Sequence, residues 1–267
     1  MDFSYKNIRG INDHVLKLGM LSPPDDIIAA WMVFKNAGKI DTMLELGSYL
    51  GGGIGIFNQV LRELGHTVAF TGVDHLDFIG AGARNSPGAW YTNHFNRCLT
   101  DEERTTLQNC DTAEQASAWI AERTLRLTGL ELNLNCVRSE TELGSEQYDI
   151  IHHDYGDSVE ENLTTIETCL PRLKDNGIYV VDDWCTGAPL RTVATVVAQQ
   201  KGLLYPVLWG KNKVFYAKNP TRAQQLVLSI IRDSDNNPKL FKFMPGSQYF
   251  GTNYKTIRMH WQAIQWN

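Results

Sequence analysis

The sequence predicts an α/β protein in which helices cover both faces of a mostly parallel sheet. Three observations lead to this fold class. Short apolar segments typical of buried strands alternate with segments whose apolar residues recur at helical spacing. Acidic residues or glycines directly follow several of the apolar segments. Because parallel strands need long crossover connections, the alternation indicates a doubly wound, Rossmann-like sheet.

The strands are expected to be seven short segments, and the last of them to be antiparallel. Helical patterns fall at 27–34, 54–64, 113–127 and 191–201, and a further helix is expected to begin near Val159. The last two strands flank Gly210-Lys211-Asn212, which is typical of a hairpin turn. The seven segments are 42–46, 68–74, 132–137, 148–152, 177–181, 205–209 and 213–217.

Composition narrows the class of function. The chain has 267 residues, 43% of them hydrophobic, which is enough for one large core. Its net charge of −5 offers no overall attraction to nucleic acid or to an anionic membrane, so a small-molecule substrate is favoured. Five cysteines without C-x-x-C spacing argue against a disulfide framework or a zinc site. With neither a membrane-spanning segment nor a signal-peptide pattern, we expect a cytoplasmic protein without a membrane partner.

We divide the chain into a helical segment at 1–41, a main domain at 42–218 and an extension at 219–267. The main domain carries an insertion at 78–129, which either covers a ligand or adds helices at a sheet edge. The extension is rich in aromatic residues, and we expect it to pack on the domain or at the interface of a homo-oligomer. A wall of the substrate pocket is the alternative.

A glycine-rich turn follows the first strand, in the run Glu45-Leu-Gly-Ser-Tyr-Leu-Gly-Gly-Gly53. Glycines let the backbone approach a ligand, and the next helix points its free N–H groups toward anionic atoms. The spacing is not G-x-G-x-x-G and no Gly-Lys-Ser/Thr follows, which disfavours a dinucleotide or P-loop site. A tight turn without any ligand remains the simpler alternative.

This run resembles motif I of class I S-adenosylmethionine-dependent methyltransferases. The E-x-G-x-Y-x-G form is similar to that of the metal-dependent catechol-type and macrolide-sugar (macrocin-type) O-methyltransferases. The resemblance implies an S-adenosylmethionine site that includes Glu45, Gly47, Ser48, Tyr49 and Gly51.

Further cofactor contacts are expected at the ends of the second and third strands. Asp74 stands about 20 residues after the last glycine, where an acid can accept the ribose hydroxyls of an adenosine. A turn aspartate is the alternative. His75 follows in the same loop. The resemblance places Ser139 near the adenine.

Three carboxylates, those of Asp154, Asp182 and Asp183, follow the predicted fourth and fifth strands. Carboxylates gathered at one sheet edge repel one another unless a cation or a proton compensates their charge. Oxygen ligands suit hard divalent ions, so we expect Mg²⁺, with Mn²⁺ or Ca²⁺ as alternatives. Helix-capping roles are the competing explanation for all three.

The segments 151–160 and 173–184 look like the metal-binding region of the same O-methyltransferases. This resemblance implies that Asp154, Asp182 and Asp183 hold the metal, with Asp154 also beside the cofactor. In those families a lysine or histidine base follows the metal aspartate, whereas this chain has Asp157 there. Asp157 and His153 are therefore the candidate catalytic bases, with His152 as a further nearby candidate. The alternatives are that Asp157 is another metal ligand or that the base comes from elsewhere.

The resulting hypothesis is a metal-dependent O-methyltransferase that acts on a small natural-product, phenolic or sugar hydroxyl. The missing lysine or histidine keeps open a non-methylating enzyme of the same fold, such as a cyclase or hydroxylase. A nucleic-acid methyltransferase is a third hypothesis, disfavoured by the acidic balance.

Overall fold

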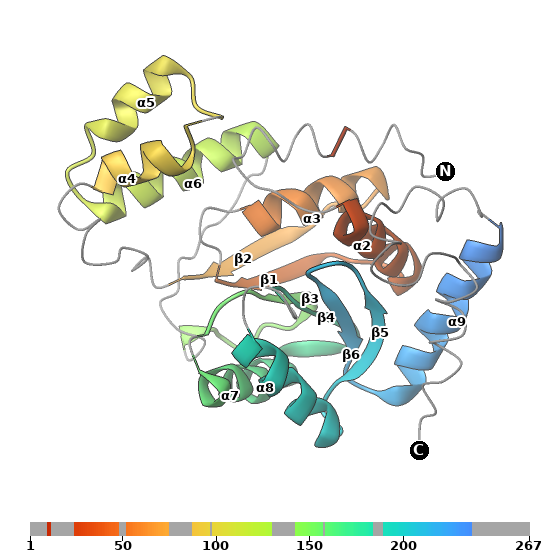
Figure 1. Cartoon of the computed structure of the whole chain (residues 1–267). Helices are drawn as coiled ribbons and strands as arrows, with labels where there is room; N and C mark the ends of the chain where they lie inside the picture. The colour runs from red at the N-terminus through yellow and green to blue at the C-terminus, as the bar shows by residue number, and fades with distance from the viewer. Residues whose placement is uncertain are drawn as a thin grey trace.

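The computed structural model describes residues 10–11, 24–47, 52–74, 87–96, 98–129, 142–156, 158–183 and 189–236. Six strands in this part of the chain form one sheet in the order β2-β1-β3-β4-β6-β5 (Figure 1). The pairs β1–β2, β1–β3 and β3–β4 are parallel, whereas β6 is antiparallel to both β4 and β5. The strands are β1 Thr42–Leu46, β2 Ala69–Val73, β3 Tyr148–His153, β4 Leu173–Val181, β5 Tyr205–Trp209 and β6 Val214–Ala217.

This arrangement confirms the predicted α/β class and the antiparallel hairpin at the end of the sheet. The predicted strand at 132–137 lies outside the described residues, so the structure shows six strands of the seven that we expected. Among the described residues, no helix is long and apolar enough to cross a membrane.

Helices pack on both faces of the sheet (Figure 1). One face is covered by α2 Pro24–Ala37, α3 Gly52–Glu63 and α9 Pro220–Asn236, and the other by α7 Val159–Cys169 and α8 Pro189–Gln200. A short 3₁₀ turn, Leu170–Arg172, connects α7 to β4. Because strand side chains alternate, Ile150 of β3 joins the core under α2 and α3, while Ile151 joins the core on the other face.

The predicted insertion contains three helices, α4 Pro87–His94, α5 Asp101–Gln108 and α6 Ala113–Thr128. They enclose a small hydrophobic cluster of their own, built around Tyr91, Phe95 and Leu107. Thr100 and Glu103 form a capping box at the start of α5, and Arg123 of α6 donates to Glu103 at 2.9 Å. These contacts give the insertion its own packed interior.

The amino edge of the sheet is held together by one carboxylate. Asp149, in β3, accepts the backbone N–H groups of Asp41 and Thr42 at 2.9 and 3.0 Å, and Lys174 donates to the same oxygen at 2.8 Å. This network joins the starts of β1, β3 and β4, at the end of the sheet opposite to the predicted site.

Candidate active site

The carboxyl ends of four neighbouring strands lie in register. Backbone hydrogen bonds continue one residue past the strands, from Gly47 to Val73 at 2.8 Å, from Asp154 to Leu46 at 2.8 Å and from Asp182 to His153 at 3.0 Å. Gly47, directly after β1, and the acids after β3 and β4 therefore share one edge. In open α/β sheets this edge is where ligands bind.

Close packing explains two of the glycines in the turn. Gly47 has φ +83°, and a Cβ there would lie 2.6 Å from the carbonyl oxygen of Asp154. At Gly53, in the first turn of α3, a Cβ would lie 2.1 Å from Glu45 Oε1. The glycines let the turn after β1 fit against the end of β3 and let α3 begin directly over Glu45.

Glu45 and His152 form a buried pair beneath the start of α3. The His152 Nδ1 lies 2.9 Å from Glu45 Oε1, and the histidine is fully buried. Its Nε2 lies 3.4 Å from Asp182 Oδ2. The predicted cofactor residue Glu45 thus contacts His152 rather than an open crevice, and His152 connects the glycine turn to the predicted metal carboxylates.

Lys213, the residue before β6, forms an ion pair with Asp182 Oδ2. Only 5% of Lys213 is exposed, so this pair is shielded from solvent. The Asp26 carboxylate, near the start of α2, fixes the hairpin that carries Lys213. Its Oδ1 accepts the backbone N–H groups of Lys211, Asn212 and Lys213 at 2.7, 2.9 and 3.1 Å.

Arg191, in the first turn of α8, holds the other carboxylate. Its Nη1 donates to Asp154 Oδ1 and to the backbone oxygen of Asp182, both at 2.9 Å. Asp183 lies farther away, with its Oδ2 4.0 Å from the same nitrogen, and has φ +53°. The exposed fraction of the side chain is 28% for Asp154, 13% for Asp182 and 46% for Asp183, so Asp154 and Asp183 are the more accessible carboxylates.

These contacts shift the pKa values of the cluster in opposite directions. Burial and the neighbouring Asp182 charge raise the pKa of Asp154. Burial would also raise the pKa of Asp182, but the Lys213 charge and the nearby His152 imidazole outweigh it and hold that pKa well below its ordinary value. For His152, burial is outweighed by the neighbouring Asp182 and Glu45 carboxylates, which raise its pKa to about 9.

The carboxylates fit a divalent ion. The donor atoms of His152, Asp154 and Asp182 lie within 4.8 Å of one another, close enough to reach one ion. The oxygen ligands are of the kind that Mg²⁺ and Mn²⁺ prefer. The structure therefore brings Asp154 and Asp182 together as expected, with His152 beside them and Asp183 at the margin.

His153, a predicted base, lies on the opposite face of β3 from His152. Its Nε2 donates to the carbonyl oxygen of Tyr155 at 2.9 Å, and its Nδ1 accepts from the Tyr179 hydroxyl at 3.0 Å. Burial and the charges of Arg191 and His152 lower the pKa of His153 well below its ordinary value. Both ring nitrogens are thus engaged inside the protein.

Asp74 directly follows β2 and is 5% exposed. Its charge is close enough to α4 of the insertion to affect Tyr91. Burial raises the pKa of Tyr91, and the Asp74 charge raises it further. Tyr91 is fully buried and its hydroxyl is 2.7 Å from Ser117 Oγ. The insertion thus approaches the sheet edge at the predicted ribose-binding acid.

Several predicted site residues lie outside the described part of the chain, and their roles remain predictions. They are Ser48, Tyr49, Gly51, His75, Ser139 and Asp157. The alternative in which Asp154 caps the helix near Val159 is wrong, because Ser158 caps α7 by accepting from the N–H of Glu161 at 3.0 Å.

The sequence reasoning missed Lys213, Arg191 and Asp26. Topology offered a signal for Lys213, since an antiparallel strand beside β4 must begin at the carboxyl edge where the parallel strands end. Arg191 stood in the first turn of a predicted helix that follows the acids. No pattern in the sequence pointed to Asp26, which reaches the hairpin across 187 residues.

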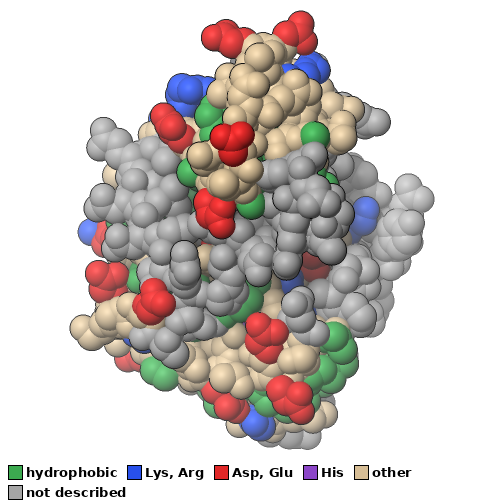
Figure 2. Space-filling model, turned by 90° about the vertical axis from the view of Figure 1, so that its left-hand side faces the viewer, with side chains coloured by type: hydrophobic (Ala, Val, Ile, Leu, Met, Phe, Trp, Pro, Cys, Tyr) green, Lys and Arg blue, Asp and Glu red, His purple; other side chains and the backbone are tan. Residues whose placement is uncertain are grey.

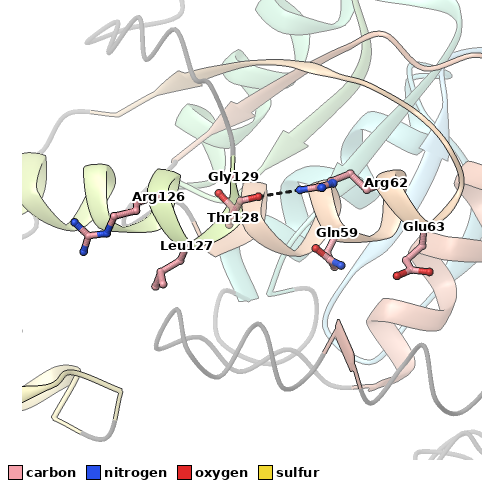
Figure 3. A pocket seen from close by; sticks show the side chains of 7 residues that line it. All are labelled: Gln59, Arg62, Glu63, Arg126, Leu127, Thr128 and Gly129. Carbon is pink, nitrogen blue, oxygen red and sulfur yellow. Dashed lines mark hydrogen bonds between the residues drawn. The ribbon is translucent and has the colours of Figure 1, made fainter.

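The face at the carboxyl edge is turned to the viewer in Figure 2. Acidic side chains occur across its described part, with basic ones among them. A separate hollow lies between the C-terminal halves of α3 and α6, where Arg62 donates to the carbonyl oxygen of Thr128 at 3.2 Å (Figure 3). Because α3 begins at the carboxyl edge and runs away from it, this hollow is remote from the carboxylates.

The parallel sheet with a glycine turn and strand-end acids defines a cofactor-binding α/β enzyme. Residues 44–184, just over half of the chain, match the family described as the methyltransferase domain. The chain therefore belongs to this family, and the predicted class I S-adenosylmethionine-dependent methyltransferase is confirmed. No curated protein matches the chain.

Several solved structures share the arrangement at low similarity. The O-methyltransferase NovP is 16% identical over 80% of this chain and 80% of its own, with a TM-score of 0.44. An O-methyltransferase from Bacillus cereus in complex with SAH is 11% identical over 82% and 93%, with a TM-score of 0.45. The TDP-rhamnose 3'-O-methyltransferase CalS11 of calicheamicin biosynthesis is 12% identical over 81% and 96%, with a TM-score of 0.43. Similarities of this size say nothing about a substrate.

Proposed function

We propose that this methyltransferase transfers the methyl group of S-adenosylmethionine to a hydroxyl of a small natural-product, phenolic or sugar substrate, with the help of a divalent metal ion. The observation that carries the proposal is the shared edge of β1, β2, β3 and β4. There Gly47, which begins the glycine-rich run, and Asp74 lie in register with Asp154 and Asp182.

In this proposal Asp154, Asp182 and Asp183 hold the ion, probed first as Mg²⁺. A bound divalent ion supplies Lewis-acid chemistry, lowering the pKa of a substrate hydroxyl that it coordinates. Arg191 keeps the Asp154 carboxylate in place through Nη1, and His152 lies against Asp182. Carboxylates held in this way would give the ion a fixed position at the carboxyl edge.

The proton of the substrate hydroxyl needs an acceptor. Both ring nitrogens of His153 are hydrogen-bonded inside the protein, which argues against this residue. We therefore assign the base to Asp157, three positions after Asp154 in the sequence.

The small-molecule acceptor is supported by charge. The net charge of −5 and the acidic side chains on the carboxyl-edge face disfavour a polyanion such as RNA or DNA. This face suits a neutral or cationic compound better.

Methyl-labelled S-adenosylmethionine, supplied with Mg²⁺ and a panel of catechols, phenolic esters and sugars, tests the proposal. We expect label in a new O-methyl group of at least one compound. The proposal would be contradicted if the protein bound the cofactor tightly, methylated no hydroxyl in the panel and instead methylated amines or RNA. A variant with Asp74→Asn, which weakens the expected ribose contact, should raise the KM for the cofactor more than that for the acceptor.

A further inference from the structure

Both oxygens of the Asp182 carboxylate already have donors from this chain. Oδ1 accepts the N–H of Asp183 at 2.8 Å, and Oδ2 is paired with Lys213 and lies 3.4 Å from His152. Since each carboxylate oxygen has two acceptor positions, Oδ2 has little capacity left while Lys213 stays in place.

Asp182 and Asp154 each have a cationic partner from this chain. Lys213 pairs with Asp182 and Arg191 pairs with Asp154. A divalent ion entering this set would lie close to a buried ammonium group, and like charges at short distance repel strongly where water is excluded. Binding therefore requires that Lys213 leave Asp182.

The Asp26 carboxylate offers Lys213 a second possible partner. Asp26 is 1% exposed and uses Oδ1 for the three N–H groups of the hairpin, one of which belongs to Lys213 itself. Its Oδ2 is buried and makes no hydrogen bond among the described residues. A buried carboxylate oxygen without a donor is costly, so an ammonium group that moved there would relieve that cost.

We propose that Lys213 is an exchangeable counter-ion, which neutralises Asp182 when no metal is bound and moves to Asp26 when a divalent ion takes its place. The inference rests on the proposed metal site. Lys213 is thus a positioning residue that weakens metal affinity, and Asp26 is the acceptor that makes the exchange feasible. The energetic coupling of the two residues is the testable consequence.

The test is a double-variant cycle read by Mn²⁺ binding, with free Mn²⁺ measured by electron paramagnetic resonance and without substrate. Removing the competing ammonium in Lys213→Met should tighten the Mn²⁺ Kd about tenfold. Asp26→Asn keeps an oxygen for the hairpin N–H groups but loses the carboxylate charge, so it should weaken Mn²⁺ binding about fivefold. In the Lys213→Met background Asp26→Asn should change the Kd less than about twofold, because its effect acts through the lysine.

Two variants serve as matched controls. Lys213→Arg keeps the charge and should not tighten the Kd, and Lys201→Met removes a surface pair with Glu167 and should leave it unchanged. If Lys213→Met is too unstable for the titration, its thermal midpoint is measured with and without saturating Mn²⁺, and the metal should raise that midpoint more than it raises the wild-type value.

Equal or weaker Mn²⁺ binding by Lys213→Met, or an undiminished effect of Asp26→Asn in the double variant, would overturn the exchange. Methyl transfer by the wild-type enzyme is scored separately. If the wild-type enzyme transferred no methyl group, the Mn²⁺ affinities would still test the exchange of Lys213. If those affinities contradicted the exchange, the proposed methyl transfer would be unaffected.

Discussion

His152 and Glu45 are directly paired neighbours on β3 and β1, and the imidazole Nδ1 lies 2.9 Å from the Glu45 carboxylate. Both residues are buried, at 0% and 1% exposure, so neither group can exchange its partner for water. The pair links the strand that leads into the glycine turn to the strand that leads into Asp154.

Replacing His152 by Leu should therefore lower the free energy of unfolding by about 3 kcal/mol, because Glu45 is left as a buried charge without its partner. Chemical denaturation monitored by circular dichroism measures the loss. His66→Leu, in the connection between α3 and β2, is the control and should change stability by less than about 0.5 kcal/mol. A loss below about 1 kcal/mol at His152 would show that the pair contributes little.

Gly47→Ala should be far more damaging than Gly65→Ala. Both glycines have φ +83°, so the backbone strain from an added Cβ is matched. Only at Gly47 would the Cβ meet other atoms, the nearest being the Asp154 carbonyl oxygen at 2.6 Å, whereas nothing lies within 4 Å at Gly65. We expect a stability loss of about 1 kcal/mol for Gly65→Ala and at least about 3 kcal/mol for Gly47→Ala. Equal losses would mean that the turn moves freely away from β3.

Asp149 should make stability depend on pH. Burial raises the pKa of Asp149, but the hydrogen bonds from Lys174 and from the N–H groups of Asp41 and Thr42 outweigh it and lower that pKa. A carboxyl with a lowered folded pKa stabilises the protein above its unfolded pKa and loses that contribution as the pH falls through the folded value. Asp149→Asn should thus cost about 1 to 2 kcal/mol at pH 7 and progressively less below about pH 4. Urea denaturation of both proteins across this range measures the difference, and a constant difference would contradict the assignment.

Single substitutions can show which of the three carboxylates bind the proposed metal ion. Asp154→Asn and Asp182→Asn should each weaken Mn²⁺ binding at least about tenfold. Asp183→Asn is a sharp test of the third ligand, since asparagine tolerates the left-handed backbone at φ +53°. Calorimetric titration gives the three affinities. An unchanged Kd for Asp183→Asn would remove that residue from the set.

Much of the sheet could be predicted because its strands are short, apolar and bounded by turn residues. Segments 42–46 and 205–209 match β1 and β5 fully. The start of β4 was missed, since Lys174-Asp175-Asn176-Gly177 has the composition of a turn. The strand nonetheless begins at Leu173, where it pairs with Tyr148 beside a register shift that accommodates the polar residues.

Only the site residues that directly follow a strand could be predicted from the sequence. Asp154 and Asp182 meet because their strands are parallel neighbours, which the alternation of elements implied. The charge balance was not predictable in detail. We expected a cation or a proton to compensate the carboxylates, and the chain itself supplies Lys213 and Arg191 from elements that follow the site in sequence. Such pairs depend on tertiary packing rather than on local pattern.

The proposed dependence of methyl transfer on a divalent metal is tested most directly by removing the metal and then restoring it. Once an acceptor is found, labelled product is quantified after treatment with excess chelator and again after Mg²⁺ is restored. We expect loss of at least about 99% of turnover in chelator and recovery with Mg²⁺. Unchanged turnover in excess chelator would contradict a metal at Asp154 and Asp182.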